Sequence, residues 1–182
     1  MKSIILLKGI ILIPLFFTLQ LKAQQKISID IGAVRQKNNH NTGMNLSGFY
    51  HFNKKLLGGI ELNRFFPVRR TIEEENVSLS SWDVEMNIHY LFPLYKGWKI
   101  YSVTGISHTA EKELSEADHF NHVENFWSLN TGAGILVELG HFLPHVEYVF
   151  TWGQVNHQFI LAGVGYEIEW GHHKASHAEK KK

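Results

Sequence analysis

The stretch SWDVEMNIHYLF, residues 81–92, alternates apolar and polar side chains. Every even position from Trp82 to Phe92 is apolar, and the odd positions from Asp83 to His89 are polar. Because successive side chains of a strand point to opposite faces, this pattern predicts a strand with one apolar and one polar face. The apolar face would cover the core of a soluble sandwich. In a transmembrane barrel it would meet lipid, and the polar face would line the interior.

The same alternation recurs along the chain and predicts eight strands. The runs are rich in the aromatic and β-branched residues that strands prefer. A strand of about 11 residues tilted by about 40° covers roughly 28 Å, close to the apolar band of about 25 Å in outer-membrane barrels. The predicted strands are residues 26–36, 43–53, 56–66, 80–92, 98–108, 126–139, 143–152 and 158–170.

The connections between these strands alternate in length. Short turns at 54–55, 93–97 and 140–142 alternate with longer polar loops at 67–79 and 109–125. Outer-membrane barrels show this asymmetry, with tight periplasmic turns and long external loops. We therefore expect an all-β fold, an eight-stranded antiparallel up-and-down transmembrane β-barrel with its apolar face toward lipid. A secreted β-sandwich is the alternative fold.

The first residues have the layout of a secretory signal peptide. Lys2 precedes an apolar run that starts at Ile4, and Ala23 is the expected cleavage site. We therefore expect a signal peptide over residues 1–23, a barrel domain over 24–170 and a polar, disordered tail over 171–182. A retained membrane anchor is the alternative for the first segment.

Charge and cysteine content exclude several classes of function. Loss of three lysines with residues 1–23 leaves 15 basic and 17 acidic side chains, a formal net charge of −2. This balance gives no indication of a nucleic-acid partner. The chain has no cysteine, so disulfides, thiolate zinc sites, cysteine nucleophiles and lipoprotein anchoring are excluded.

Taken in phase, the strands present a polar face that should line the lumen. Asn63, Asn87 and Asn130 share this face with glycines such as Gly134, which leave room for larger neighbours. Carboxylates and histidines form its expected polar cluster. The cluster consists of Asp30, Glu61, Asp83, Glu85, Glu147, His51, His89 and His145.

The opposite face should meet lipid, with aromatic side chains near the strand ends, where they form girdles at the membrane interfaces. The expected interface aromatics are Trp82, Tyr90, Phe92, Trp98, Trp127, Trp152, Tyr166 and Trp170. Strand 98–108 is ambiguous, because Tyr101 and Val103 on one face compete with Ile100 and Ile106 on the other.

Four segments resemble a known family. The segments YSVTG (101–105), LNTGAGILVEL (129–139), LPHVEYVF (143–150) and LAGVGYEIEW (161–170) are similar to the small outer-membrane β-barrel family, whose members are similar to the transmembrane domain of outer membrane protein A. The resemblance covers 26–170 and implies a location in the cell outer membrane, reached through the periplasm. It implies contact with outer-membrane lipid and lipopolysaccharide, and with the barrel-assembly machinery and periplasmic chaperones during biogenesis. It brings no catalytic residues.

The inward carboxylates allow two interpretations. Ions buried without partners are costly, so these groups must hydrogen-bond, hold water or take up protons. They can line a narrow cation-selective or proton-conducting pore. They can also belong to a closed polar core that fixes strand register, which we favour because eight strands enclose a lumen that side chains just fill.

The sequence indicates no metal, cofactor or catalytic site. His119 and His122 lie in the acidic loop 109–125, and His172, His173 and His177 lie in the tail. Histidines in such solvated segments are weak evidence for a metal site.

An enzyme that modifies lipid A is the remaining alternative. Ser107 and His108 lie near the outer end of strand 98–108, but neighbours in a regular strand point to opposite faces and cannot act together. The lipid A deacylases carry a serine two places after the histidine, and here that place is Ala110.

The predicted function is therefore that of an integral outer-membrane barrel with a structural or surface-interaction role and no enzymatic activity. A narrow cation-selective channel is the alternative, and a lipid A hydrolase is a weaker one. An extracellular ligand of loops 67–79 and 109–125 would fit this function, but the sequence does not identify it.

Overall fold

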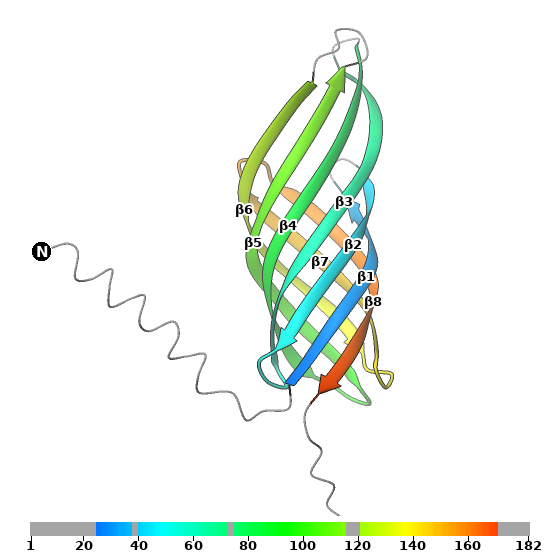
Figure 1. The fold of residues 1–182 in the computed structure, drawn as a ribbon, viewed down its shortest axis with the longest axis vertical. Helices are drawn as coiled ribbons and strands as arrows, with labels where there is room; N and C mark the ends of the chain where they lie inside the picture. The colour runs from blue at the N-terminus through cyan, green and yellow to red at the C-terminus, as the bar shows by residue number, and fades with distance from the viewer. Residues whose placement is uncertain (1–24, 38–39, 73–74, 116–120, 171–182) are drawn as a thin grey trace, which may run out of the picture. The chain divides into compact units, whose positions relative to one another are not determined.

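Eight antiparallel strands form one β-sheet that closes into a barrel with up-and-down order β1 to β8 (Figure 1). The computed structural model describes residues 25–37, 40–72, 75–115 and 121–170. The strands are β1 (Gln25–Gln36), β2 (Thr42–His51), β3 (Leu56–Ile72), β4 (Glu75–Pro93), β5 (Trp98–Ser115), β6 (Asn121–Val137), β7 (Phe142–Gly153) and β8 (His157–Trp170). The predicted fold class is confirmed.

Lys26–Ile168 form one compact unit, the barrel. Gln25, Glu169 and Trp170 are the described residues of a second unit. The predicted signal peptide and the predicted tail lie outside the described residues. In the described ranges, no helix is long and apolar enough to cross a membrane.

The apolar face of the sheet lies on the outside of the barrel. Met86 is 59% exposed, whereas its neighbour Glu85 is 3% exposed. Exposed isoleucine, leucine, valine and methionine side chains cover the outside of most strands, as in a barrel that is solvated by lipid. The interpretation of the 81–92 alternation as apolar outside and polar inside is therefore correct.

All eight predicted interface aromatics are exposed, and the seven that belong to the barrel unit lie on its outer face. Trp82, Trp127 and Trp152 lie toward the end of the barrel at which β4 and β6 begin and β7 ends. Tyr90, Phe92, Trp98 and Tyr166 lie toward the opposite end, at the short turns, and Trp170 is the last described residue.

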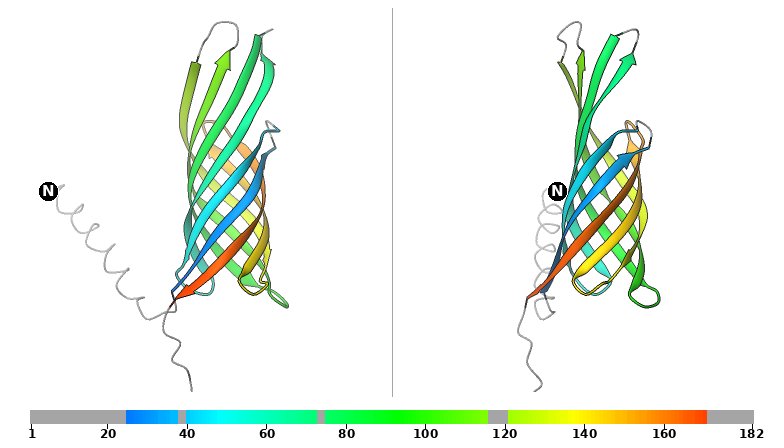
Figure 2. Two further views of the ribbon diagram at one scale, coloured as in Figure 1. Left: turned by 45° about the vertical axis from the view of Figure 1, so that its right-hand side comes forward. Right: turned by 90° about the vertical axis from the view of Figure 1, so that its right-hand side faces the viewer.

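Strands β3 to β6 continue well beyond the other four as a curved four-stranded sheet (Figure 2). We call this sheet, residues 66–72, 75–80, 110–115 and 121–127, the extension. Its strands remain in register, with Val68 opposite Leu79 and Glu113 opposite His122. A register shift between Phe65 and Val68 marks the start of the extension on β3.

The prediction of irregular loops at 67–79 and 109–125 is therefore wrong. Most of these residues form the extension, and only 73–74 and 116–120, which are not described, lie between its strands. Outside the membrane neither face of a strand has to meet lipid, so its residues do not need to alternate strictly between apolar and polar. This absence of alternation is the reason that 67–79 and 109–125 resemble loops in sequence.

The lumen contains apolar side chains as well as polar ones. Tyr101 and Val103 point inward, and Ile100 and Ile106 face lipid, which resolves the ambiguous phase of β5. Phe65 and Phe159 stack inside the barrel with their ring centroids 5.5 Å apart. The buried apolar cluster consists of Val34, Phe49, Leu57, Phe65, Leu91, Tyr101, Val103, Val149 and Phe159. The lumen is thus filled by apolar side chains as well as by the polar cluster.

Candidate functional site in the barrel lumen

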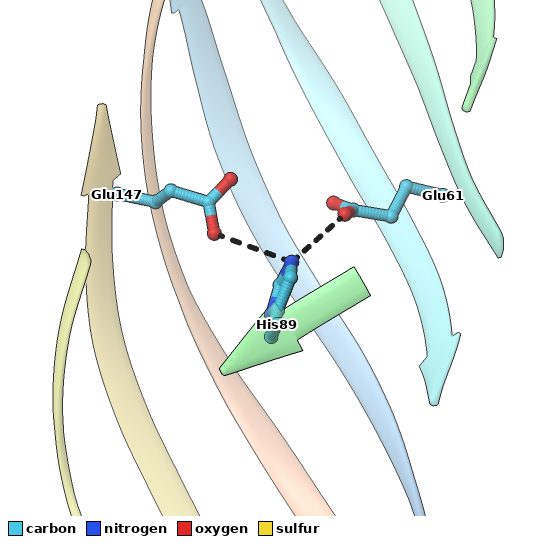
Figure 3. A group of neighbouring side chains, drawn as sticks. All are labelled: Glu61, His89 and Glu147. Atoms are coloured by element: carbon cyan, nitrogen blue, oxygen red, sulfur yellow. Dashed lines mark ion pairs between the residues drawn. The ribbon is translucent and has the colours of Figure 1, made fainter. Parts of the chain in front are cut away.

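Three ionisable side chains from three strands meet inside the barrel (Figure 3). His89 on β4 points between Glu61 on the adjacent strand β3 and Glu147 on β7. His89 Nε2 lies 3.6 Å from Glu61 Oε1 and 3.9 Å from Glu147 Oε2. All three residues are buried, with exposed fractions of 4% to 6%. We call Glu61, His89 and Glu147 the lumen triad.

Two aromatic rings hold the imidazole of His89. The ring centroid of Phe49 lies 4.5 Å from that of His89, and the ring of Tyr101 stacks on it at 5.1 Å. Each aromatic ring lies over an inward-facing glycine, Phe49 over Gly59 and Tyr101 over Gly134. A Cβ atom at either glycine would collide with the ring above it. The glycines therefore make room for the rings that position His89.

Glu85 is the centre of an amide network next to the lumen triad. Its Oε1 accepts a hydrogen bond from Asn63 Nδ2 at 2.7 Å. Its Oε2 accepts from Asn87 Nδ2 at 2.9 Å and from Asn130 Nδ2 at 2.6 Å. Asn87 Nδ2 also donates to Glu61 Oε1 at 2.7 Å, which connects the network to the triad. Side-chain amides thus satisfy the Glu85 carboxylate, which forms no ion pair within the described residues.

The other predicted histidines of the cluster lie near carboxylates of their own. His145 Nδ1 lies 3.8 Å from Asp30 Oδ1 and 3.1 Å from the Leu143 carbonyl oxygen. Toward the short turns, His51 Nδ1 lies 4.0 Å from Glu167 Oε2. All eight predicted cluster residues point into the barrel. In the described ranges, Glu61, His89 and Glu147 are the group of three whose donor atoms lie within 4.8 Å of one another.

Another ionisable group lies at the outer end of the lumen, beyond the apolar band. His157 Nε2 is 3.7 Å from Glu111 Oε1. Burial raises the pKa of Glu111 above its usual range, and the nearby Glu124 and Glu113 carboxylates raise it further. Burial also lowers the pKa of His157. Both shifts favour the uncharged forms of the two side chains.

The candidate serine and histidine of a hydrolase do not form a site. Ser107 is buried in the lumen and donates a hydrogen bond to Asn130 Oδ1 at 3.0 Å. His108 points to the outer face, where its ring contacts Trp127. The two side chains point to opposite faces of β5, as expected for neighbouring residues of a strand.

The histidines of the predicted loop and tail form no described cluster. His122 is exposed and contacts Glu124, with Nε2 3.1 Å from Oε1. His119 and the three tail histidines lie outside the described residues.

Sequence reasoning missed the aromatic part of the site. It assigned His89 and both carboxylates to the lumen, but it treated the lumen as polar throughout. Phe49 and Tyr101 share the inward phase of their strands with polar residues, so the phase of the alternation could have placed them inside. The phase of the alternation does not predict that either ring contacts His89.

The donor set of the lumen triad allows two kinds of chemistry. One imidazole and two carboxylates can hold a divalent cation, because these are ligands that transition metals accept. The same three groups can share a proton that bridges the imidazole and a carboxylate.

Comparison with known proteins shows a likeness in structure only. No protein-family model matches the chain. No curated protein matches its sequence. Several solved structures of outer-membrane barrels do match.

The attachment invasion locus protein Ail of Yersinia pestis is 20% identical, with a TM-score of 0.57, over 80% of this chain and 100% of Ail. The N-terminal β-barrel domain of OprF from Pseudomonas aeruginosa is 17% identical, with a TM-score of 0.61, over 80% of this chain and 98% of that domain. OprG, an outer membrane protein of Pseudomonas aeruginosa, is 14% identical, with a TM-score of 0.59, over 82% of this chain and 98% of OprG.

At these identities the likeness is one of fold. The resemblance to small outer-membrane β-barrels is confirmed at that level, and it supports the predicted location in the outer membrane.

Proposed function

We propose that this chain is an integral outer-membrane protein that acts at the cell surface through its extension and has no enzymatic activity. The extension carries the proposal, because it is a folded sheet that projects beyond the apolar band on the side opposite the short turns (Figure 2). Long structured projections are not needed to hold a barrel in the membrane.

The edges of the extension support a role in binding proteins. The pairing of β2 with β3 ends at Phe65, and the pairing of β6 with β7 ends at Ser128. Beyond these residues, β3 and β6 each pair with only one strand of the described chain. Strand edges of this kind can accept an added strand from a partner.

The packing of the lumen supports a structural role for the barrel itself. Side chains that line a water-filled pore would be exposed to water. Phe65, Asn130 and Asn45 face the interior and are only 1% to 2% exposed. Hydrogen bonds join Asn45 to Asn63 and Ser107 to Asn130 across neighbouring strands. A lumen packed in this way favours the closed core over the pore.

Shortening the extension in register tests this function. One variant would replace 69–78 with a two-residue Asn-Gly turn, so that the paired residues Val68 and Leu79 flank it. A second would replace 112–123 with the same turn between the paired residues Glu111 and Glu124. Proteins captured by cross-linking on intact cells would be identified by mass spectrometry for the full chain and for both variants.

We expect partner capture with the full chain and its loss in the shortened variants, while the barrel still folds. Folding would be checked by the gel mobility of unheated samples. Equal capture by the full chain and both variants would assign the role to another part of the protein. Unchanged lipid A mass spectra in expressing cells would agree with the absence of enzymatic activity.

A narrow cation-selective channel is the second candidate, supported by the excess of carboxylates in the lumen. Asp30, Glu61 and Glu147 have histidines as their ion-pair partners in the described chain. Conductance in planar bilayers decides between the two functions. Steady cation-selective currents that fall in Glu61→Gln would favour the channel, whereas a silent bilayer with folded protein would favour the closed core.

A further inference from the structure

We propose that the lumen triad Glu61, His89 and Glu147 is a binding site for a divalent transition-metal ion of the zinc class. The site would lie inside the barrel, separate from the extension and from any surface partner. The proposal rests on the geometry of the three donors, on an imidazole nitrogen without a hydrogen bond, and on the charge of the site.

The donor atoms are spaced for a small metal ion. A tetrahedral ion with metal–ligand bonds of about 2.0–2.2 Å holds its ligand atoms roughly 3.3–3.6 Å apart. His89 Nε2 and Glu61 Oε1 are 3.6 Å apart, and His89 Nε2 and Glu147 Oε2 are 3.9 Å apart. One donor atom from each residue lies within 4.8 Å of the others. A small movement of the long Glu147 side chain from β7 would close the site.

The imidazole nitrogen that faces the carboxylates lacks a hydrogen bond. His89 Nε2 is buried and has no hydrogen-bond partner, since both carboxylate oxygens lie beyond hydrogen-bond distance. Buried polar atoms in native proteins nearly always have a partner, so this nitrogen is free to take a ligand that lies between it and the carboxylates. Figure 3 shows that the nitrogen points into the space between the two carboxylates.

The surroundings of the triad hold the donors as a metal site requires. Asn87 donates to Glu61 Oε1 at 2.7 Å and fixes that carboxylate from outside. Phe49 and Tyr101 both pack against the ring of His89. Such outer contacts orient metal ligands and tune their affinity.

Charge favours a cation at this position. Metal binding requires deprotonated carboxylates and a neutral imidazole, and in that state the three groups carry a formal charge of −2, which a divalent ion balances. Neither Lys nor Arg forms an ion pair with Glu61 or Glu147 in the described chain. The imidazole disfavours magnesium and calcium, which prefer all-oxygen sites, and the oxygen ligands disfavour copper(I). Zinc, and cobalt as its spectroscopic substitute, fits the donor set.

Cobalt titration of the folded protein tests the site. The full chain would carry His172→Ala, His173→Ala and His177→Ala, so that the tail cannot bind metal. It would be folded in metal-free detergent, and cobalt would be added either before or after folding, because the lumen is closely packed. Visible absorption of bound cobalt and metal content after gel filtration would be measured, followed by displacement with zinc.

We expect one cobalt ion per chain, with the intense visible bands of a four-coordinate ion, displaced by zinc. Binding should be lost in His89→Gln and weakened at least tenfold in Glu147→Gln. His145→Gln is the matched control, because it removes a lumen histidine that faces Asp30 and lies outside the triad. Gel mobility of unheated samples would confirm that each variant is folded.

Two results would overturn the proposal. Folded protein that binds no cobalt under either order of addition would leave a bridging proton as the ligand of the triad. Binding that survives both His89→Gln and Glu147→Gln would identify an adventitious site elsewhere.

Discussion

At the scale of single residues, glycines on the inner wall of the barrel make room for large side chains on the adjacent strand. Tyr101 lies over Gly134, its partner on the adjacent strand, and Phe49 lies over Gly59 in the same way. Both rings then reach His89. The position of one histidine therefore depends on two residues without side chains.

Gly134→Ala should destabilise the barrel by about 1–3 kcal/mol, because the added methyl group forces Tyr101 out of its position. The free energy of unfolding would be measured by reversible denaturation in lipid vesicles. Gly48→Ala is the matched control, because Gly48 lies on the outer face of β2 and the nearest atom to an added Cβ is 4.0 Å away. Equal effects of the two substitutions would mean that Tyr101 is free to move.

Met86→Arg should cost about 2–4 kcal/mol, the penalty for a basic side chain at the bilayer midplane. Met86 lies midway between the interface residues Trp82 and Tyr90 on the outer face of β4. The same vesicle measurement applies, and Met86→Ala separates lost packing from added charge. A cost no larger than that of Met86→Ala would show that this position does not contact hydrocarbon.

The sequence was sufficient to predict the face of each residue on β4, but not which residues meet. Alternation assigns Glu61, His89 and Glu147 to the interior one strand at a time. Glu147 reaches the other two from a strand that is not adjacent to theirs, and this contact depends on strand tilt and stagger. The phase of β5 was ambiguous for a related reason, since Tyr101 and Val103 form part of an apolar layer inside the lumen.

At the scale of strands, the extension divides β3 to β6 into two environments. The membrane part of each strand separates apolar from polar faces, and this part was predicted from alternation. The extension was predicted as loops, because Arg69 and Arg70 on β3 and Glu111 and Glu113 on β5 interrupt any apolar pattern. Its order comes instead from pairing between neighbouring strands, which a single-strand pattern does not contain.

An epitope inserted between Ile72 and Glu75 should be tolerated and displayed on intact cells, because the insertion lengthens a connection and leaves the register unchanged. The same epitope inserted after Arg69 should reduce the amount of folded protein, since it interrupts paired strands. Antibody labelling of whole cells would measure display.

An insertion in the short turn between β6 and β7, at Gly140, is the control for topology. This turn should be hidden from antibody until the outer membrane is opened. Labelling of the Gly140 insertion on intact cells, without labelling at the end of β3, would invert the proposed orientation.

At the scale of the whole molecule, closure of the barrel and packing of the lumen act together. Each strand pairs on both sides within the barrel, so that there is no open edge in the hydrocarbon. Inside, apolar contacts such as that of Phe65 with Phe159 and polar contacts such as the amide network of Glu85 fill the lumen. Unfolding must therefore disrupt the sheet and the interior at the same time.

The protein should fractionate with the outer membrane, and its unheated form should migrate differently from its heated form on a denaturing gel. A closed sheet resists detergent until it is heated, because no strand can separate without losing partners on both sides. Cell fractionation would measure the location of the protein. Extraction of the periplasm without detergent is the control. Recovery as a soluble periplasmic protein with one mobility would contradict the barrel.

The extension also determines how the molecule would carry a mechanical load. Its strands are continuous with those of the membrane wall, so a pull on its tip acts along the strands. Hydrogen bonds in an antiparallel sheet run across the strands, and such a pull loads many of them in parallel shear. Peeling would load them one at a time. A cell tethered through this sheet would therefore transmit force directly into a wall anchored in the bilayer, without a flexible hinge of irregular chain at the membrane surface.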